Sequence, residues 1–253
     1  MLEKNRLAPW LVLTVALLPI ACVNLNQWLS ISGGYIPACF PYIEGCTSIS
    51  STGRHGVSYW LFKALMLPQS LLLIAFWRSL EHWLASHAVV GVWMLRLAIV
   101  ASAFLVLYTV FLGSSGDFYR LMRRYGVFVF FLGTFIAQIT ATRRLAIINA
   151  EQRPRALLSV QRVLLGVMTV LALAEVPLGT FGFKDDVAEN IIEWNFSLLM
   201  QLWFLTWLWA RPRRDDPANA TDHIWTIRWS LRPCSWISAI CTESGAGFEK
   251  RKP

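Results

Sequence analysis

The sequence predicts an all-α integral membrane protein, a bundle of six transmembrane helices with both termini in the cytoplasm. Only 15% of the 253 residues are charged and 56% are hydrophobic, whereas a soluble domain carries about 25% charged residues. Several apolar runs also reach about 20 residues, the length that crosses a hydrocarbon core. We expect spans near residues 7–27, 59–77, 88–112, 126–141, 156–178 and 191–205.

Basic residues set the expected orientation, because cytoplasmic loops are enriched in Lys and Arg. Lys4 and Arg6 precede the first span, which we expect to remain uncleaved, and four arginines fall within residues 143–155. Residues 1–210 are thus a predicted six-span membrane domain, and residues 211–253 are a predicted cytoplasmic tail. The tryptophans and arginines of this tail make it a candidate interfacial segment.

The longest outer connection contains a polar stretch, residues 45–59, which is the first candidate site. Ser48 and Ser50 supply hydroxyl groups, and Arg54 and His55 lie between two glycines. Glycines on both sides of a basic pair favour a tight turn that brings backbone N–H groups close to an anion. The alternative is an ordinary capped turn into the second span.

Cys39 and Cys46 flank a short Pro- and Gly-containing loop in this same connection. Outside the membrane the setting is oxidising, so a disulfide is plausible, and two free thiols are the alternative. We expect no metal site: His82 and His87 are five residues apart, a spacing that does not place them on one helical face.

The second outer connection, residues 113–125, contains Asp117, Arg120 and Arg123. With Arg124, the arginines recur at helical spacing and can share a face. Three arginines on the outer side oppose the positive-inside tendency, so we expect a local partner. That partner is either an acidic residue from another span or a lipid phosphate.

Acidic and amide residues enter the membrane with the last two spans. Glu175 falls one turn from the outer end of the fifth span, and Glu193 and Asn195 begin the sixth. Glu193, Ser197 and Gln201 repeat every four residues and form a polar stripe, which should face the bundle interior. Hydrogen bonding between helices, without any ligand, is the alternative.

Three of these segments resemble the FRAG/DRAM/Sfk family of six-span membrane proteins. The resemblance is carried by residues 46–53 before an aromatic helix, by the run from Arg123 to Phe131, and by the Glu193–Trp194 pair. It implies a role in lipid remodelling, membrane lipid asymmetry or autophagy control. The chain departs from the family pattern at Arg54, where Pro is common, and at Arg123, where many members have His.

We therefore expect a protein that binds lipid headgroups at the outer-leaflet end of its bundle and acts in membrane lipid homeostasis. A lipid-remodelling enzyme, with Glu193 or His55 as base and Ser48 or Ser50 as nucleophile, is an alternative, although no known catalytic signature is present. A structural partner subunit is another. We expect membrane lipids and membrane proteins as partners, no cofactor and no nucleic acid. The host would be the plasma membrane, or the inner membrane of a bacterium.

Overall fold

The apolar runs form long helices in the computed structural model, which describes residues 7–87, 91–152, 155–180 and 186–210. Every regular element in these ranges is helical, and five of the helices are long and apolar enough to cross a membrane. These findings identify an all-α integral membrane protein. The five are α1 (Pro9–Ser32), α4 (Gly56–Ala85), α5 (Trp93–Phe111), α6 (Asp117–Gln152) and α7 (Arg155–Thr180).

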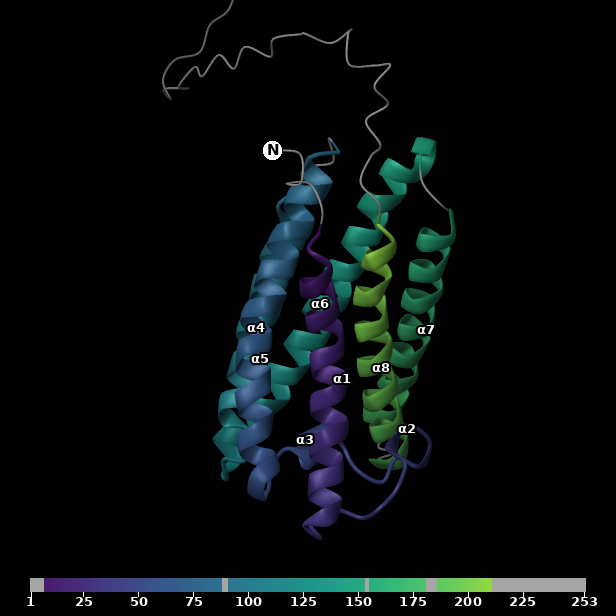
Figure 1. The fold of residues 1–253 in the computed structure, drawn as a ribbon. Helices are drawn as coiled ribbons and strands as arrows, with labels where there is room; N and C mark the ends of the chain where they lie inside the picture. The colour runs from purple at the N-terminus through teal and green to yellow at the C-terminus, as the bar shows by residue number, and fades with distance from the viewer. Residues whose placement is uncertain (1–6, 88–90, 153–154, 181–185, 211–253) are drawn as a thin grey trace, which may run out of the picture. The chain divides into compact units, whose positions relative to one another are not determined.

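A further long helix, α8 (Asp186–Thr206), lies beside α1 and α7 (Figure 1) and continues into the 3-10 turn η1 (Trp207–Trp209). The bundle is completed by α5 against α4 and α6, and by α1 against α4. Two short helices, α2 (Pro41–Glu44) and α3 (Ile49–Thr52), lie at one end. We call this the cap end: α1 and α5 finish there, and α4, α6 and α8 begin there.

Several helices extend beyond the predicted spans. Glu81 and His82, which we expected in an inner loop, lie within α4, and Arg143 and Arg144 lie within α6. Asp117 was expected in an outer loop but stands in the first turn of α6. Those loop predictions were wrong because charge ends an apolar run without ending a helix, and an acidic residue in a first turn stabilises the helix. The predicted tail, 211–253, lies outside the described residues.

A proline in α1 is compensated by a side chain from α4. Pro19 has no N–H group, so the carbonyl of Val15, four residues earlier, loses its intrahelical donor. Gln69 of α4 is buried and donates its Nε2 hydrogen to the Val15 oxygen at 2.8 Å. The helix therefore continues through Pro19 inside the bundle, and α1 is fixed to α4 at mid-height.

Small residues allow α5 and α6 to approach closely. A Cβ added to Gly126 would contact the backbone of Tyr108 at 3.0 Å, and one added to Gly133 would meet Ala101 at 3.0 Å. Glycines seven residues apart lie on one helical face, a pattern typical of helix pairs in membranes. This packing sets the position of Tyr108, which contributes to the site described below.

The end of the bundle opposite the cap is held by a buried ion pair. Arg144 of α6 binds both carboxylate oxygens of Glu81 in α4, at 2.5 and 3.0 Å, and also donates to the carbonyl of Gly91 at 3.3 Å. Next to it, Gln161 of α7 accepts from Thr142 at 3.1 Å and donates to Thr206 at 2.8 Å. These contacts join α4, α6, α7 and α8.

Candidate functional site

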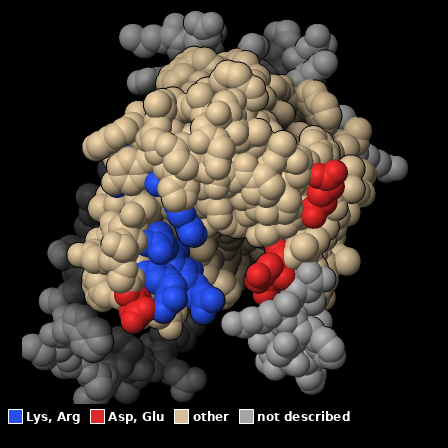
Figure 2. Space-filling model, turned by 90° about the horizontal axis from the view of Figure 1, so that it is seen from below, with Lys and Arg blue, Asp and Glu red and all other residues tan. Residues whose placement is uncertain are grey.

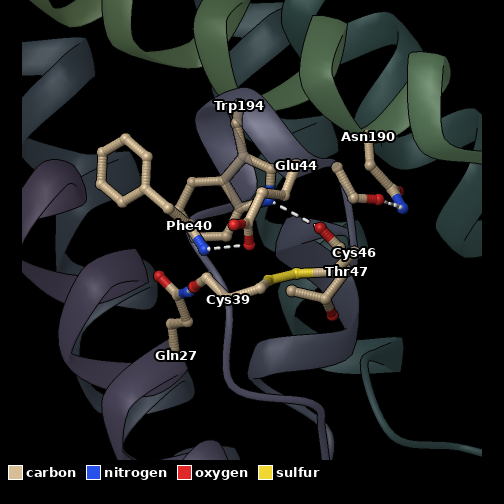
Figure 3. Close-up of a disulfide and its surroundings, with 9 residues drawn as sticks. Gln27, Cys39, Phe40, Glu44, Cys46, Thr47, Asn190 and Trp194 are labelled. Carbon is tan, nitrogen blue, oxygen red and sulfur yellow. Dashed lines mark hydrogen bonds between the residues drawn. A yellow bond between two sulfur atoms is a disulfide. The ribbon is translucent and has the colours of Figure 1, made fainter.

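A disulfide closes the loop that contains α2 at the cap end (Figure 3). Cys39 and Cys46 are bonded, with their Cα atoms 6.5 Å apart. Inside the loop, the backbone N–H of Phe40 donates to the Glu44 carboxylate at 2.9 Å. Gly45 ends α2 with a positive φ of 60°, a conformation that glycine adopts without strain.

Side chains of α8 hold this loop through its backbone carbonyls (Figure 3). Asn190 donates to Gly45 at 2.7 Å, and the buried indole of Trp194 donates to Thr47 at 2.8 Å. Asn195, a predicted headgroup residue, donates instead to the carbonyl of Tyr42 at 2.8 Å. The first three turns of α8 therefore form the docking surface for the loop, and Asn195 has a structural partner.

The segment from Cys39 to Thr52, which we call the cap loop, is also held by α1. Gln27 donates to the carbonyl of Cys39 at 2.9 Å, and the buried hydroxyl of Ser30 donates to the carbonyl of Thr52 at 2.7 Å. Because α1 and α8 are the first and last long helices described, the loop joins the two ends of the membrane domain.

The predicted serines form one hydrogen-bonded group with Arg54. Ser48 caps α3 by accepting from the Ser51 backbone N–H at 3.2 Å, and its hydroxyl lies 3.1 Å from that of Ser50. Ser50 accepts from Arg54 Nη2 at 2.7 Å. His55 lies apart from them: its exposed ring stacks on Tyr35 with centroids 5.1 Å apart.

The arginines of α6 differ in what they bind. Arg120 is exposed and pairs with Asp117 three residues earlier. Arg123 is partly buried and donates to the carbonyls of Phe111 and Ser114. A cation at the carboxyl end of α5 is well placed to bind its last carbonyls. Arg123 therefore orders the α5–α6 connection and still lies at the cap end.

Opposite charges gather on two sides of this end. Arg123 lies close enough to Arg54 and Arg120 to interact electrostatically with both. Glu193 interacts in the same way with Glu175 and with Glu189 of α8. Figure 2 shows basic side chains gathered on one side of a recess at this end, with one acidic group beside them, and further acidic side chains on the other side. We call Arg54, Arg120 and Arg123 the basic cluster.

A cavity of about 40 Å³ lies within the bundle, next to the cap end. The three residues of the polar stripe, Glu193, Ser197 and Gln201, all line it, and so do Gln69 and Tyr108. Glu193 also accepts a hydrogen bond from the backbone N–H of Ile49 in α3 at 3.3 Å. The remaining lining residues are apolar, from α1, α3, α4, α5, α6 and α8: Pro19, Val23, Ile49, Phe62, Met66, Leu73, Leu105, Val127, Phe130, Phe131 and Phe204.

Three buried oxygens around the cavity have no hydrogen-bond partner among the described residues. They are the hydroxyl of Tyr108 and the amide oxygens of Gln69 and Gln201, in side chains exposed by 4%, 1% and 4%. Sequence reasoning did not assign Gln69 or Tyr108 to a site. A glutamine and a tyrosine in apolar helices carry no spacing signal, and only the packing of α4 and α5 brings them to the cavity.

The described residues contain one group with metal-type ligands, Cys39, Glu44 and Cys46, whose ligand atoms lie within 4.8 Å of one another. Both sulfurs take part in the disulfide, so neither is available as a thiolate ligand. Comparisons of the chain with protein-family models, with curated proteins and with solved structures found no match.

Proposed function

We propose that this protein binds phospholipid headgroups at the cap end of its bundle and acts in membrane lipid homeostasis. The observation that carries the proposal is the basic cluster, Arg54, Arg120 and Arg123, beside the hydroxyls of Ser48 and Ser50. Arginine presents a planar set of N–H donors that suits phosphate oxygens. Of these three arginines only Arg120 forms an ion pair among the described residues, with Asp117, and a cluster of arginines at a membrane surface favours an anionic ligand.

The proposal includes a sixth span and a defined orientation. At 21 residues, α8 extends about 31 Å, which matches a hydrocarbon core of about 30 Å. Its polar residues lower its hydropathy, yet the carbonyls of the cap loop and the cavity offer partners for them. Both termini are then cytoplasmic and the cap end faces outward.

A membrane-impermeant thiol reagent should label Ser115→Cys in intact cells and leave Ser86→Cys unlabelled. The reverse labelling pattern would show the opposite topology.

The resemblance to the FRAG/DRAM/Sfk family remains part of this proposal. It rests on the segment from Cys46 to Gly53 and on the Glu193–Trp194 pair. These two segments lie together in the bundle, where Trp194 binds the carbonyl of Thr47 and Glu193 accepts from Ile49. The two motifs therefore meet at one place in this bundle, and on the strength of the sequence resemblance we propose a role in membrane lipid organisation.

A structural role for the polar residues is the second candidate. Arg123 and Asn195 bind backbone carbonyls, so part of the predicted site stabilises the connections between helices.

An enzymatic function is less well supported. Ser48 and Ser50 bond to hydroxyls, to a backbone N–H and to Arg54, and within the described chain neither bonds to a carboxylate or an imidazole that would activate it.

Native mass spectrometry of the detergent-purified protein would test lipid binding. The test variant is Arg54→Gln/Arg120→Gln, which removes two exposed charges of the basic cluster. Its matched control is Arg143→Gln, which removes an exposed arginine near the other end of α6. We expect wild type and control to retain phospholipid and the test variant to lose it without a change in melting temperature. Equal retention in all three proteins would overturn the proposal.

A further inference from the structure

The cavity and the basic cluster together indicate what kind of headgroup would bind. Resting on the proposed function, we propose that the site selects a headgroup that carries both a phosphate and a primary ammonium. The phosphate lies on the basic cluster, and the ammonium lies against Glu193 and Tyr108 where the cavity approaches the cap. Phosphoethanolamine carries both of these groups, and we propose that it is presented as the headgroup of a membrane lipid.

The polar lining of the cavity calls for a ligand that donates hydrogen bonds. The buried oxygens of Tyr108, Gln69 and Gln201 are unpaired among the described residues, and an unsatisfied buried polar group is costly. The NH₂ group of Gln69 donates to the Val15 carbonyl, which fixes the orientation of the amide, and the oxygen at its other end is an acceptor only. Glu193 adds a carboxylate, of which one oxygen accepts from Ile49. A primary ammonium supplies three N–H donors.

The lengthwise position of these groups separates them into two levels. Glu193 lies two turns into α8 and Tyr108 one turn from the end of α5, so both are near the cap. Gln201 lies eight residues deeper than Glu193, about 12 Å along the helix axis. We assign the ammonium to the level near the cap end, beside Glu193 and Tyr108. We assign water, held by Ser197, Gln69 and Gln201, to the level farther from the cap end.

The size of the cavity favours a small donor. A volume of about 40 Å³ accommodates roughly three water molecules, at about 10–15 Å³ each. A trimethylammonium group is bulkier and has no N–H donor, so it would leave the buried Tyr108 oxygen without a hydrogen-bond donor. Such groups are recognised by aromatic faces, and Phe62, Phe130 and Phe131 do line the cavity. A phosphocholine lipid is therefore the proper competitor in a test.

The charges at the cap end fit a ligand of both signs. Arg54 interacts electrostatically with Glu193, and Tyr108 interacts with Arg54, Arg123 and Glu193. The basic cluster and the Glu193 carboxylate therefore act electrostatically on the same end of the bundle. A headgroup with phosphate alone would match the arginines and would leave Glu193 without a cationic ligand.

Competitive lipid binding would test the selectivity. The wild type, delipidated in detergent, is incubated with equal amounts of phosphatidylethanolamine, phosphatidylcholine and phosphatidylglycerol of identical acyl chains, and the bound lipids are counted by native mass spectrometry. We expect at least a tenfold preference for phosphatidylethanolamine. Glu193→Gln should reduce the preference to threefold or less while total lipid binding persists. The control Glu44→Gln, an exposed cap carboxylate outside the cavity, should keep the full preference.

Tyr108→Phe serves as a second variant, because it removes an unpaired hydroxyl and breaks no hydrogen bond of the described structure. It should fold as the wild type does and lose part of the preference. Binding without preference, a preference for phosphatidylcholine, or full selectivity in both folded variants would overturn the inference. Stabilisation by free phosphoethanolamine without lipid selectivity would assign a soluble ligand and overturn the lipid assignment. Absence of any bound phospholipid in the wild type would instead overturn the proposed function.

Discussion

Replacing Arg144 should destabilise the protein, because it breaks the buried ion pair at the end of the bundle opposite the cap. Its guanidinium binds both oxygens of Glu81, and the two side chains are only 8% and 17% exposed. Removing one partner of a buried ion pair leaves an uncompensated charge and costs about 3–5 kcal/mol. At about 2–4 °C per kcal/mol for a chain of this size, Arg144→Met should lower the melting temperature by about 6–20 °C.

The matched control is the neighbouring Arg143→Met, which removes an exposed arginine of the same helix. Thermal unfolding in detergent, followed by the fluorescence of the 13 tryptophans, would compare the two. The double variant Glu81→Met/Arg144→Met should recover most of the loss, because no buried charge is then left unpaired. The reasoning is refuted if Arg144→Met melts within about 2 °C of its control, or if the double variant is no more stable than Arg144→Met.

Two further predictions concern the packing of the bundle. Gln69→Leu should destabilise the protein by about 1–3 kcal/mol, because it leaves the buried Val15 carbonyl without a donor. The loss of stability should be smaller in a Pro19→Ala background, where residue 19 regains the backbone N–H that binds this carbonyl. An unchanged loss in that background would contradict the account. Gly45→Ala should melt well below Gly34→Ala. Both have positive φ, but only a Cβ at position 45 would overlap the backbone of α8, so equal melting temperatures would argue against that contact.

The helices were predictable from the sequence because their signal is local. Runs of apolar residues identify helices long enough to cross a membrane, and five such helices lie within the described residues. Their ends were less predictable. Hydropathy reports where the hydrocarbon ends, whereas the backbone of α6 continues through Arg144 as far as Gln152, since helical hydrogen bonds form in water as well as in lipid.

The polar stripe of the last helix was also a local signal, and the structure brings Glu193, Ser197 and Gln201 to one cavity. The partners of such residues were not predictable. Glu81 and Arg144 are 63 positions apart, and nothing in either segment indicates the other. Asn195 likewise has the composition of a ligand-binding residue, and only the docked loop reveals that it binds the Tyr42 carbonyl.

The contacts between the cap loop and α8 have a consequence for the order of biosynthesis. The loop leaves the ribosome early, yet the side chains that bind its carbonyls at Gly45 and Thr47 come 145 and 147 residues later. The loop therefore cannot reach its final conformation until the last long helix has been inserted. A chain interrupted before α8 would display unpaired carbonyls at the cap, a state that membrane quality control could distinguish from the finished protein.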